Sequence, residues 1–340
     1  MSFKIWSDYK YKVENNEAVI YKYMGNDEEV TVPNIIDGFP VTKINASLVG
    51  DCGFCNSDTL KRVIIPEGVE EIPIFSFSNS KSLENVTIPA SVTEISGSAF
   101  NRSRALTNIS VNKDNPKYAD VDGILFSKDK TELIYYPQGK ANEHYKIPAG
   151  VTKIGYGAFA GCPLKSVTIP GSVAKVSFGA FQGCRNLQNV TLMPGVQKID
   201  FDAFENCAAL TDIAIPASVT EIDMCAFNGC TSLVNIDVDE NNMKYSDFNG
   251  ALYDKNQKKL IYVPLNNEFA VEPAGLTEYG RLSHGGNKRF THLNVSATIT
   301  NIHPEAFDGC EALQCGNHQS GSLLGSACPR YISAGKYNQT

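Results

Sequence analysis

The sequence predicts a β-rich solenoid, because a 23-residue pattern recurs along the chain at a fixed spacing. The clearest copies begin at Val173, Val196 and Val219, and each contains V-x-x-I or V-x-x-V, an Ala-Phe pair, a Cys, a Leu and a final apolar pair. Repeats of this length bury their apolar faces only against their neighbours, so they stack into one elongated domain. We therefore expect about nine such coils in a single domain, although 340 residues would often form two globular ones.

Each coil is predicted to contain two short extended segments and one buried aromatic side chain. Counting the first residue of a copy as position 0, apolar residues at positions 17 and 19 alternate with polar ones at 16 and 18, which indicates a half-buried strand. The initial V-x-x-I indicates a second extended segment. Position 8 predicts a spine of stacked rings: Phe77, Phe100, Phe159, Phe181, Phe204, Phe227 and Phe307. The copies begin at Val41, Val69, Val92, Val151, Val173, Val196, Val219, Leu276 and Ile299.

Two copies depart from the spine pattern. Val49 occupies position 8 of the first copy. In the copy that begins at Leu276, Ser283 and His284 replace the Ala-Phe pair, and Asn287 replaces the Cys. We expect this coil to be loosely packed.

The consensus V-T-x-I-x-x-x-A-F-x-x-C-x-x-L-x-x-V-x-I-P resembles the BspA-like class of leucine-rich repeats. The segment from Tyr11 to Ile44, with its two apolar runs, resembles the N-terminal hairpin cap of that family. The resemblance covers about residues 8–313, and it implies a leucine-rich-repeat solenoid that host-associated microbes display or secrete. We accordingly assign residues 1–40 to the cap, 41–314 to the solenoid and 315–340 to a Gly/Ser-rich tail.

Two related insertions interrupt the repeats at about residues 112–147 and 239–272, and we call them the first and second island. They match at a constant offset of 127 residues, so that Asp122-Gly123 corresponds to Asn249-Gly250. Asp-Gly or Asn-Gly before an alternating apolar run predicts a β-hairpin. We interpret the islands as structural elaborations of the solenoid, and a ligand-contacting role is the alternative.

The repeat accounts for most of the ten cysteines, because position 11 holds Cys52, Cys162, Cys184, Cys207, Cys230 and Cys310. Leucine-rich repeats use this position for a small buried Cys or Asn that satisfies loop backbone groups, and a buried Cys packs as a small hydrophobe. Parallel stacked side chains disfavour bridges between coils, so we expect free thiols. Cys52 and Cys55 have redox or zinc spacing but lack a second pair and a nearby His. The sequence does not decide whether Cys315 and Cys328 in the tail form a disulfide.

The outward side chains of the predicted strands form the candidate ligand-binding surface. They are polar and mostly uncharged, and solenoid curvature favours a broad concave surface for a macromolecular ligand. The alternative is that they are only β-compatible surface residues, since no large aromatic side chain marks a hot spot among them. The candidate residues are Asn85, Thr87, Asn108, Ser110, Ser166, Thr168, Asn189, Thr191, Asp212, Asn235, Asp237, His292 and Asn294.

Composition limits the function classes further. The net charge of −7 gives no electrostatic footprint for nucleic acid, and no 18-residue apolar run predicts a membrane span. The five histidines are scattered, and no nucleophile stands out beside a base, so we predict no catalytic residues. The acidic turns at Asp120–Asp122 and Asp237–Asp239 do not complete a calcium-loop spacing, so we expect neither a metal nor a cofactor.

Together these observations predict a non-catalytic surface or secreted interaction protein of the adhesin type. We expect a monomer that binds a protein or glycan macromolecule. The alternative is a structural spacer or scaffold for a functional domain outside this chain. The start of the sequence lacks an apolar signal core, so a surface location implies that an export signal has been removed.

Overall fold

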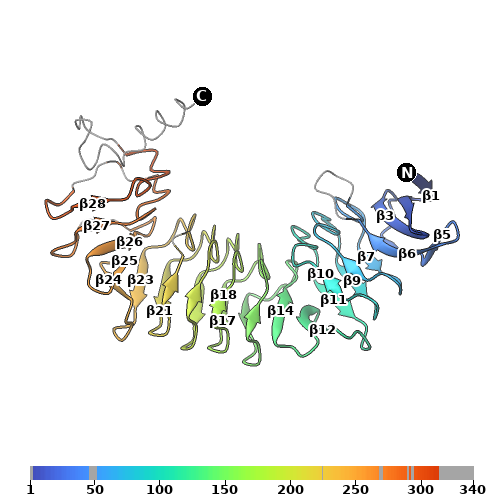
Figure 1. Ribbon diagram of the computed structural model, residues 1–340, viewed down its shortest axis with the longest axis horizontal. Helices are drawn as coiled ribbons and strands as arrows, with labels where there is room; N and C mark the ends of the chain where they lie inside the picture. Colours follow the sequence, from blue (N-terminus) through green and yellow to red (C-terminus); the bar gives the residue numbers. More distant parts are fainter. Residues whose placement is uncertain are drawn as a thin grey trace. The chain divides into compact units, whose positions relative to one another are not determined.

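The computed structural model describes residues 3–45, 52–223, 225–267, 271–288, 291 and 295–313. Every regular element within these ranges is a β-strand, and the strands wind into about 12 turns, which confirms the leucine-rich-repeat solenoid (Figure 1). The turns outnumber the nine predicted coils because the cap and both islands add turns. The chain divides into two compact units, Met1–Asn142 with Gly150–Pro163 and Glu143–Ala149 with Leu164–Thr340.

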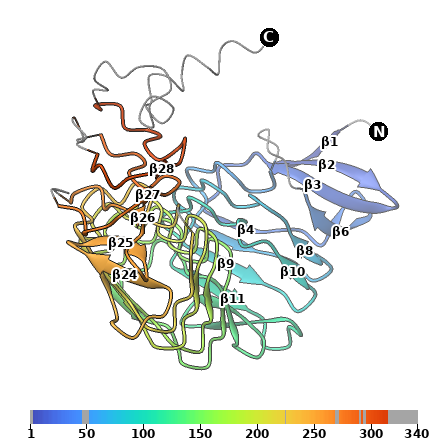
Figure 2. The ribbon, with the colours of Figure 1, turned by 60° about the vertical axis from the view of Figure 1, so that its left-hand side comes forward.

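The first unit begins with the predicted hairpin cap. Strands β2 (Tyr9–Glu14) and β3 (Glu17–Tyr23) pair antiparallel, and the turn between them has left-handed backbone at Asn15 and Asn16, with φ of 50° and 63°. Both central residues of a type I′ turn need positive φ, which Asn tolerates. Figure 2 shows β1, β2 and β3 side by side at the N-terminal end. From β6 onward the strands of successive coils pair in parallel.

The sheets of the first unit follow the repeat. One sheet runs β1 (Lys4–Trp6), β2 (Tyr9–Glu14), β3 (Glu17–Tyr23), β6 (Phe39–Ile44), β8 (Glu71–Ile72) and β10 (Glu94–Ile95), with β5 (Ile35–Ile36) beside β6. Another runs β4 (Glu29–Thr31), β7 (Arg62–Ile64), β9 (Asn85–Ile88) and β11 (Asn108–Val111). The first island contributes β12 (Tyr118–Val121), β13 (Ile124–Ser127) and β14 (Glu132–Tyr135), followed by β16 (Lys153–Ile154).

The second unit repeats this plan. Its longer strands, at positions 16 to 19, are β15 (His144–Lys146), β17 (Ser166–Ile169), β19 (Asn189–Leu192), β21 (Asp212–Ile215) and β23 (Asn235–Val238). Its short strands are β18 (Lys175–Val176), β20 (Lys198–Ile199) and β22 (Glu221–Ile222). The second island and the last coils form β24 (Tyr245–Phe248), β25 (Ala251–Asp254), β26 (Lys259–Tyr262), β27 (Glu278–Tyr279) and β28 (Asn301–Ile302).

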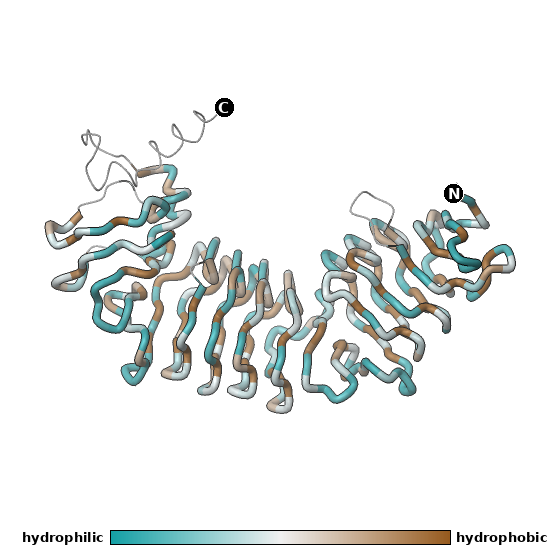
Figure 3. The backbone as a smooth tube through the Cα atoms, in the orientation of Figure 1, coloured by the Kyte–Doolittle hydropathy of each residue, from teal (hydrophilic) through white to brown (hydrophobic). Residues whose placement is uncertain are grey.

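The predicted aromatic spine is present in both units. In the first, the rings of Phe77 and Phe100 are stacked with centroids 5.5 Å apart, and Tyr135 of the first island follows at 5.3 Å. In the second, Phe204 lies between Phe181 at 5.4 Å and Phe227 at 5.9 Å. All of these side chains are buried. Apolar and polar residues alternate along each coil, as the tube in Figure 3 shows.

The described part of the coil that begins at Leu276 is not loosely packed, so the prediction was wrong for these residues. Ser283 and His284 are both buried, and the imidazole is stacked on the ring of Phe307 with centroids 4.7 Å apart. The histidine ring occupies the spine position because it is flat and close to a phenyl ring in size. Its burial lowers the pKa of His284 to about 3, so the ring is neutral at physiological pH.

Position 11 does satisfy backbone groups, as predicted. The Cys207 thiol donates to the carbonyl of Phe181 at 3.2 Å, and the Cys230 thiol donates to that of Phe204 at 3.1 Å. The acceptor is in each case the spine residue of the preceding coil. Ser80 occupies the same position in an earlier coil and donates its hydroxyl to the carbonyl of Phe54 at 2.7 Å. A serine hydroxyl and a cysteine thiol at position 11 therefore both donate to the backbone carbonyl of the preceding spine residue.

The first coil corrects two predictions. The copy that begins at Val41 is 28 residues long, five more than the period, and its spine ring is Phe54, stacked 5.5 Å from Phe77. Val49 lies outside the described residues. Because of the extra residues, Cys52 does not occupy position 11, and it forms a disulfide with Cys55 instead. The prediction of free thiols was therefore wrong for this pair.

The islands contain the predicted hairpins, β12–β13 and β24–β25, and each hairpin covers the edge of a long strand. At β11, the N–H of Ile109 donates to the carbonyl of Gly123 at 3.0 Å, and the N–H of Val111 donates to the Asp120 carboxylate at 2.8 Å. The N–H groups of Ile236 and Val238 in β23 are bonded in the same way by the second island. The hairpins thus satisfy donors that an open sheet edge would leave to solvent.

The predicted tail, with Cys315 and Cys328, lies outside the described residues. Within the described ranges, no helix is long and apolar enough to cross a membrane.

Candidate ligand-binding surface

Two polar strips contain the candidate residues that the structure describes, one in each unit. The first strip consists of the outward side chains of β4, β7, β9 and β11, and the second consists of those of β15, β17, β19, β21 and β23. The strips arise because each long strand alternates buried apolar residues with outward polar ones. In β19, for example, Val190 and Leu192 are buried, whereas Asn189 and Thr191 are exposed.

The first strip has strict parallel register. Asn85 of β9 pairs with Asn108 of β11, and Thr87 pairs with Ser110, so equivalent side chains lie next to each other. The two islands limit how far such rows extend. A Cβ on Gly123 would lie 2.5 Å from Oδ1 of Asn108, so only glycine lets the island turn lie this close to the strip.

The second strip changes its charge along the row. At one end, Lys146 of β15 pairs with Thr168, which in turn pairs with Thr191 of β19. At the other end, Asp212 of β21 pairs with Asn235 of β23. The remaining candidate residue of β23, Asp237, is exposed, whereas Ser166 of β17 is half-buried. The strip therefore presents a cation at one end and two carboxylates at the other.

Several strip side chains have hydrogen-bonding groups available for a ligand. Within the described part of the chain, the side chains of Asn189, Thr191, Asp212 and Asp237 make no hydrogen bond to other protein groups. By contrast, the amide of Asn108 donates to Ser110 Oγ at 2.8 Å. The second strip is thus the more open of the two.

A serine–histidine contact occurs at the end of the second strip, which the sequence did not predict. Nδ1 of His144 lies 2.7 Å from Oγ of Ser166. A hydrolytic triad also needs an acid that orients the imidazole. The adjacent Glu143 carboxylate instead lies 2.6 Å from the Lys165 ammonium, and this hydrogen bond lowers the pKa of Glu143. The contact belongs to the polar surface and lacks the arrangement of a triad.

Sequence reasoning missed four residues of the first strip, Glu29 and Thr31 of β4 and Arg62 and Ile64 of β7. Arg62 and Ile64 of β7 pair with Asn85 and Thr87 and are exposed, and Arg62 lies 3.7 Å from the carboxylate of Glu29 in β4. The longer first coil shifted their positions away from 16 and 18. The signal that would have identified them is the L-x-x-V-x-I motif at residues 60–65.

A second omission is the pair Phe178 and Phe201 at position 5 of two successive coils. Their rings are stacked 5.6 Å apart, and Phe201 is 41% exposed. His292 and Asn294, predicted as part of the surface, lie outside the described residues. Among the described residues, no cluster of three or more His, Cys, Asp or Glu side chains is arranged to hold a metal ion.

The repeat motif, the stacked spine and the position-11 hydrogen bonds define the fold family. A model of the BspA type leucine-rich repeat region matches residues 47–138 and 152–269, in six copies. The chain belongs to this family. It is therefore a repeat-based interaction or surface protein. A search of curated proteins finds no significant relative of the chain.

A solved structure agrees on the fold. The chain is similar to a leucine-rich repeat protein from Eubacterium ventriosum, with a TM-score of 0.51, 17% identity and coverage of 95% of this chain and 98% of that one. It is also similar to the pneumococcal vaccine antigen PcpA, with a TM-score of 0.49, 20% identity and 92% coverage of both chains. A leucine-rich cell surface protein from Faecalibacterium prausnitzii has a TM-score of 0.43, 24% identity and coverage of 70% of this chain and 95% of that one.

Proposed function

We propose that this protein is a surface-displayed or secreted adhesin-type protein that binds a macromolecule, a protein or a glycan, through its polar strips. Family membership supports an extracellular location and a non-catalytic role. The observation that carries the proposal is the second strip, where Asn189, Thr191, Asp212 and Asp237 keep their polar groups available on the parallel strands β19, β21 and β23.

The charge change along the second strip favours a ligand with complementary charge. Complementary potentials accelerate encounter and fix the orientation of the partner. The exposed Ile64 in the first strip adds apolar contact area to an otherwise polar surface. A partner of the first strip would therefore combine hydrogen-bonding groups with a limited apolar patch, as glycoproteins do.

The test is binding to immobilised extracellular-matrix glycoproteins, each presented intact and after enzymatic deglycosylation. We expect the double variant Asn189→Lys/Thr191→Lys to weaken binding at least tenfold, because two ammonium groups would replace neutral ligand contacts. The matched control is Gln197→Lys/Thr220→Lys, which adds the same charge at exposed residues outside the strips. Loss on deglycosylation would identify a glycan ligand, and retention would identify a protein ligand.

Equal binding by both double variants would refute the role of the strip. If neither the protein nor its variants bound any member of the panel, the alternative of a structural spacer would be favoured.

A further inference from the structure

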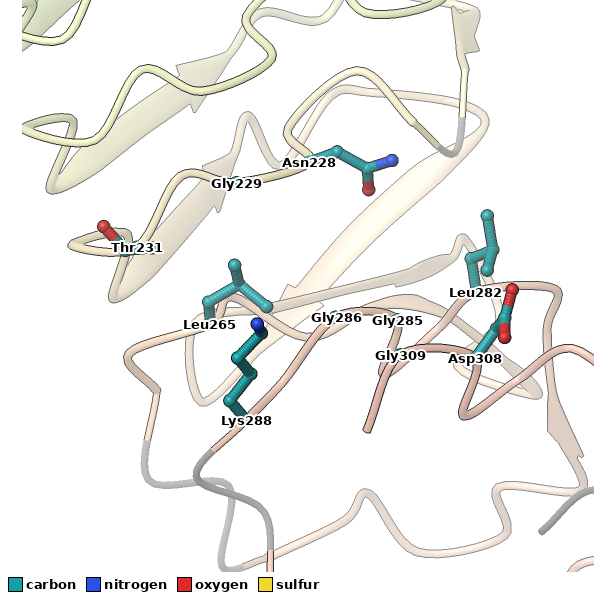
Figure 4. A pocket seen from close by; sticks show the side chains of 10 residues that line it. All are labelled: Asn228, Gly229, Thr231, Leu265, Leu282, Gly285, Gly286, Lys288, Asp308 and Gly309. Carbon is teal, nitrogen blue, oxygen red and sulfur yellow. The ribbon is translucent and has the colours of Figure 1, made fainter. Parts of the chain in front are cut away.

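A pocket of about 710 Å³ lies beside the second island, in the second unit (Figure 4). Its walls are the turn around Asn228 and Thr231, the island residue Leu265 and the turns of the two following coils. Its size lies within the range of small-molecule sites. We propose that this pocket binds a saccharide of one or two sugar units.

The pocket exists because the second island lacks a side chain that fills the same space in the first. Gln138 of the first island corresponds to Leu265 at the offset of 127 residues. The Gln138 side-chain amide is almost completely buried and donates to the carbonyl of Ala160 in the next coil. A Cβ on Gly161 would lie 3.0 Å from its nitrogen, so the amide fills this space. Leu265 has no donor with which to make the equivalent bond.

The turn that precedes each island also has longer side chains in the first unit than in the second. Arg102 and Arg104 are exposed in the first unit, and the residues at the same positions in the second unit are Gly229 and Thr231. In the following coil, Gly285 takes the position of Ala160. At these three positions the second unit thus has shorter side chains than the first.

The side chains around the pocket combine apolar surface with hydrogen-bonding groups, and a sugar ring can contact both. Figure 4 shows Lys288 beside Leu265, and Asp308 beside Leu282. The leucines offer aliphatic surface to the C–H face of a sugar ring, and the charged groups offer a donor and an acceptor to its hydroxyls. Asn228 adds an amide that can both donate and accept.

Lys288 is available to such a ligand. Its ammonium lies 3.6 Å from the carboxylate of Glu311, and both side chains are 72% exposed. An ion pair at this distance in solvent contributes little, so it does not hold the ammonium away from the pocket.

The chemistry favours a saccharide over a peptide. All residues that line the pocket lie in turns or bends, so it offers no strand edge to which an extended peptide could add. The pocket shares no residue with the polar strips, so its ligand is independent of the function proposed for them.

The test measures binding of small probes to the whole chain by isothermal titration calorimetry. One panel contains methyl glycosides of glucose, galactose and N-acetylglucosamine together with lactose and N,N′-diacetylchitobiose, and a second panel contains tripeptides. Thr231→Arg/Leu265→Gln introduces the side chains of the first unit into the pocket. Thr211→Arg is the matched control, because it adds an arginine at an exposed position of the preceding coil outside the pocket.

We expect at least one saccharide to bind the wild type and the Thr211→Arg control equally, and binding to fall at least tenfold in Thr231→Arg/Leu265→Gln. Asp308→Asn should weaken binding of the same saccharide. If circular dichroism shows that the double variant does not fold, the affinity of Asp308→Asn decides whether the proposal stands. The proposal is overturned if no saccharide binds, if only tripeptides bind, or if the pocket variants bind as well as the wild type.

Discussion

Replacing Phe204 with alanine tests the aromatic spine. The ring is fully buried between Phe181 and Phe227, with interplanar angles of 9° and 4°, so the substitution removes two stacked contacts and leaves a cavity. Phe→Ala changes in a core cost about 3–5 kcal/mol. A matched control lies three residues earlier in the same coil, where Phe201 is 41% exposed and stacked on Phe178. The stacking of such an aromatic pair contributes about 0.5–1.5 kcal/mol beyond the area that it buries.

The assay is urea unfolding followed by far-UV circular dichroism for the wild type, Phe204→Ala and Phe201→Ala. Because both residues belong to one coil, they report on the same cooperative unit of the solenoid. We expect the unfolding free energy of Phe204→Ala to fall at least twice as far as that of Phe201→Ala. Equal losses for the two variants would refute the buried spine as the main source of stability in this coil.

Three further predictions concern other parts of the fold. Burial holds the pKa of His284 at about 3, whereas a histidine in an unfolded chain has a pKa of about 6.5. As the pH falls, the unfolded state therefore binds a proton before the native state does. The native state accordingly loses stability between about pH 6.5 and pH 3. His284→Phe should therefore gain stability over the wild type as the pH is lowered from 7 to 5, and a constant difference in unfolding midpoint would contradict this. Peptide mapping without reductant should recover Cys52 and Cys55 linked to each other, and recovery of both as free thiols would contradict the disulfide. Asp120→Ala should destabilise the protein by about 1–3 kcal/mol, because the N–H of Val111 loses its acceptor. Asp120→Asn keeps an acceptor oxygen and should lose much less stability. No change in either variant would show that the hairpin does not cap the strand.

Much of the candidate surface was predictable because strand alternation is a local property. Once residues 17 and 19 of a repeat are apolar, the residues at 16 and 18 must face the other way, so Asn189 and Thr191 were placed outward from the sequence. Arg62 and Ile64 were missed because five extra residues in the first coil displaced the count. Whether the outward residues bind a ligand is a matter of chemistry that strand alternation does not determine.

The sequence by itself determined the repeat, the parallel stacking of its coils and the buried spine, because a period of 23 residues brings like residues together in every turn. Only the tertiary structure decided what happens where the period breaks. It placed Phe54 in the spine, joined Cys52 to Cys55 and left space beside Leu265 that Gln138 fills in the first island. These features depend on contacts between residues of different coils, and no local pattern along the chain encodes which side chains will meet there.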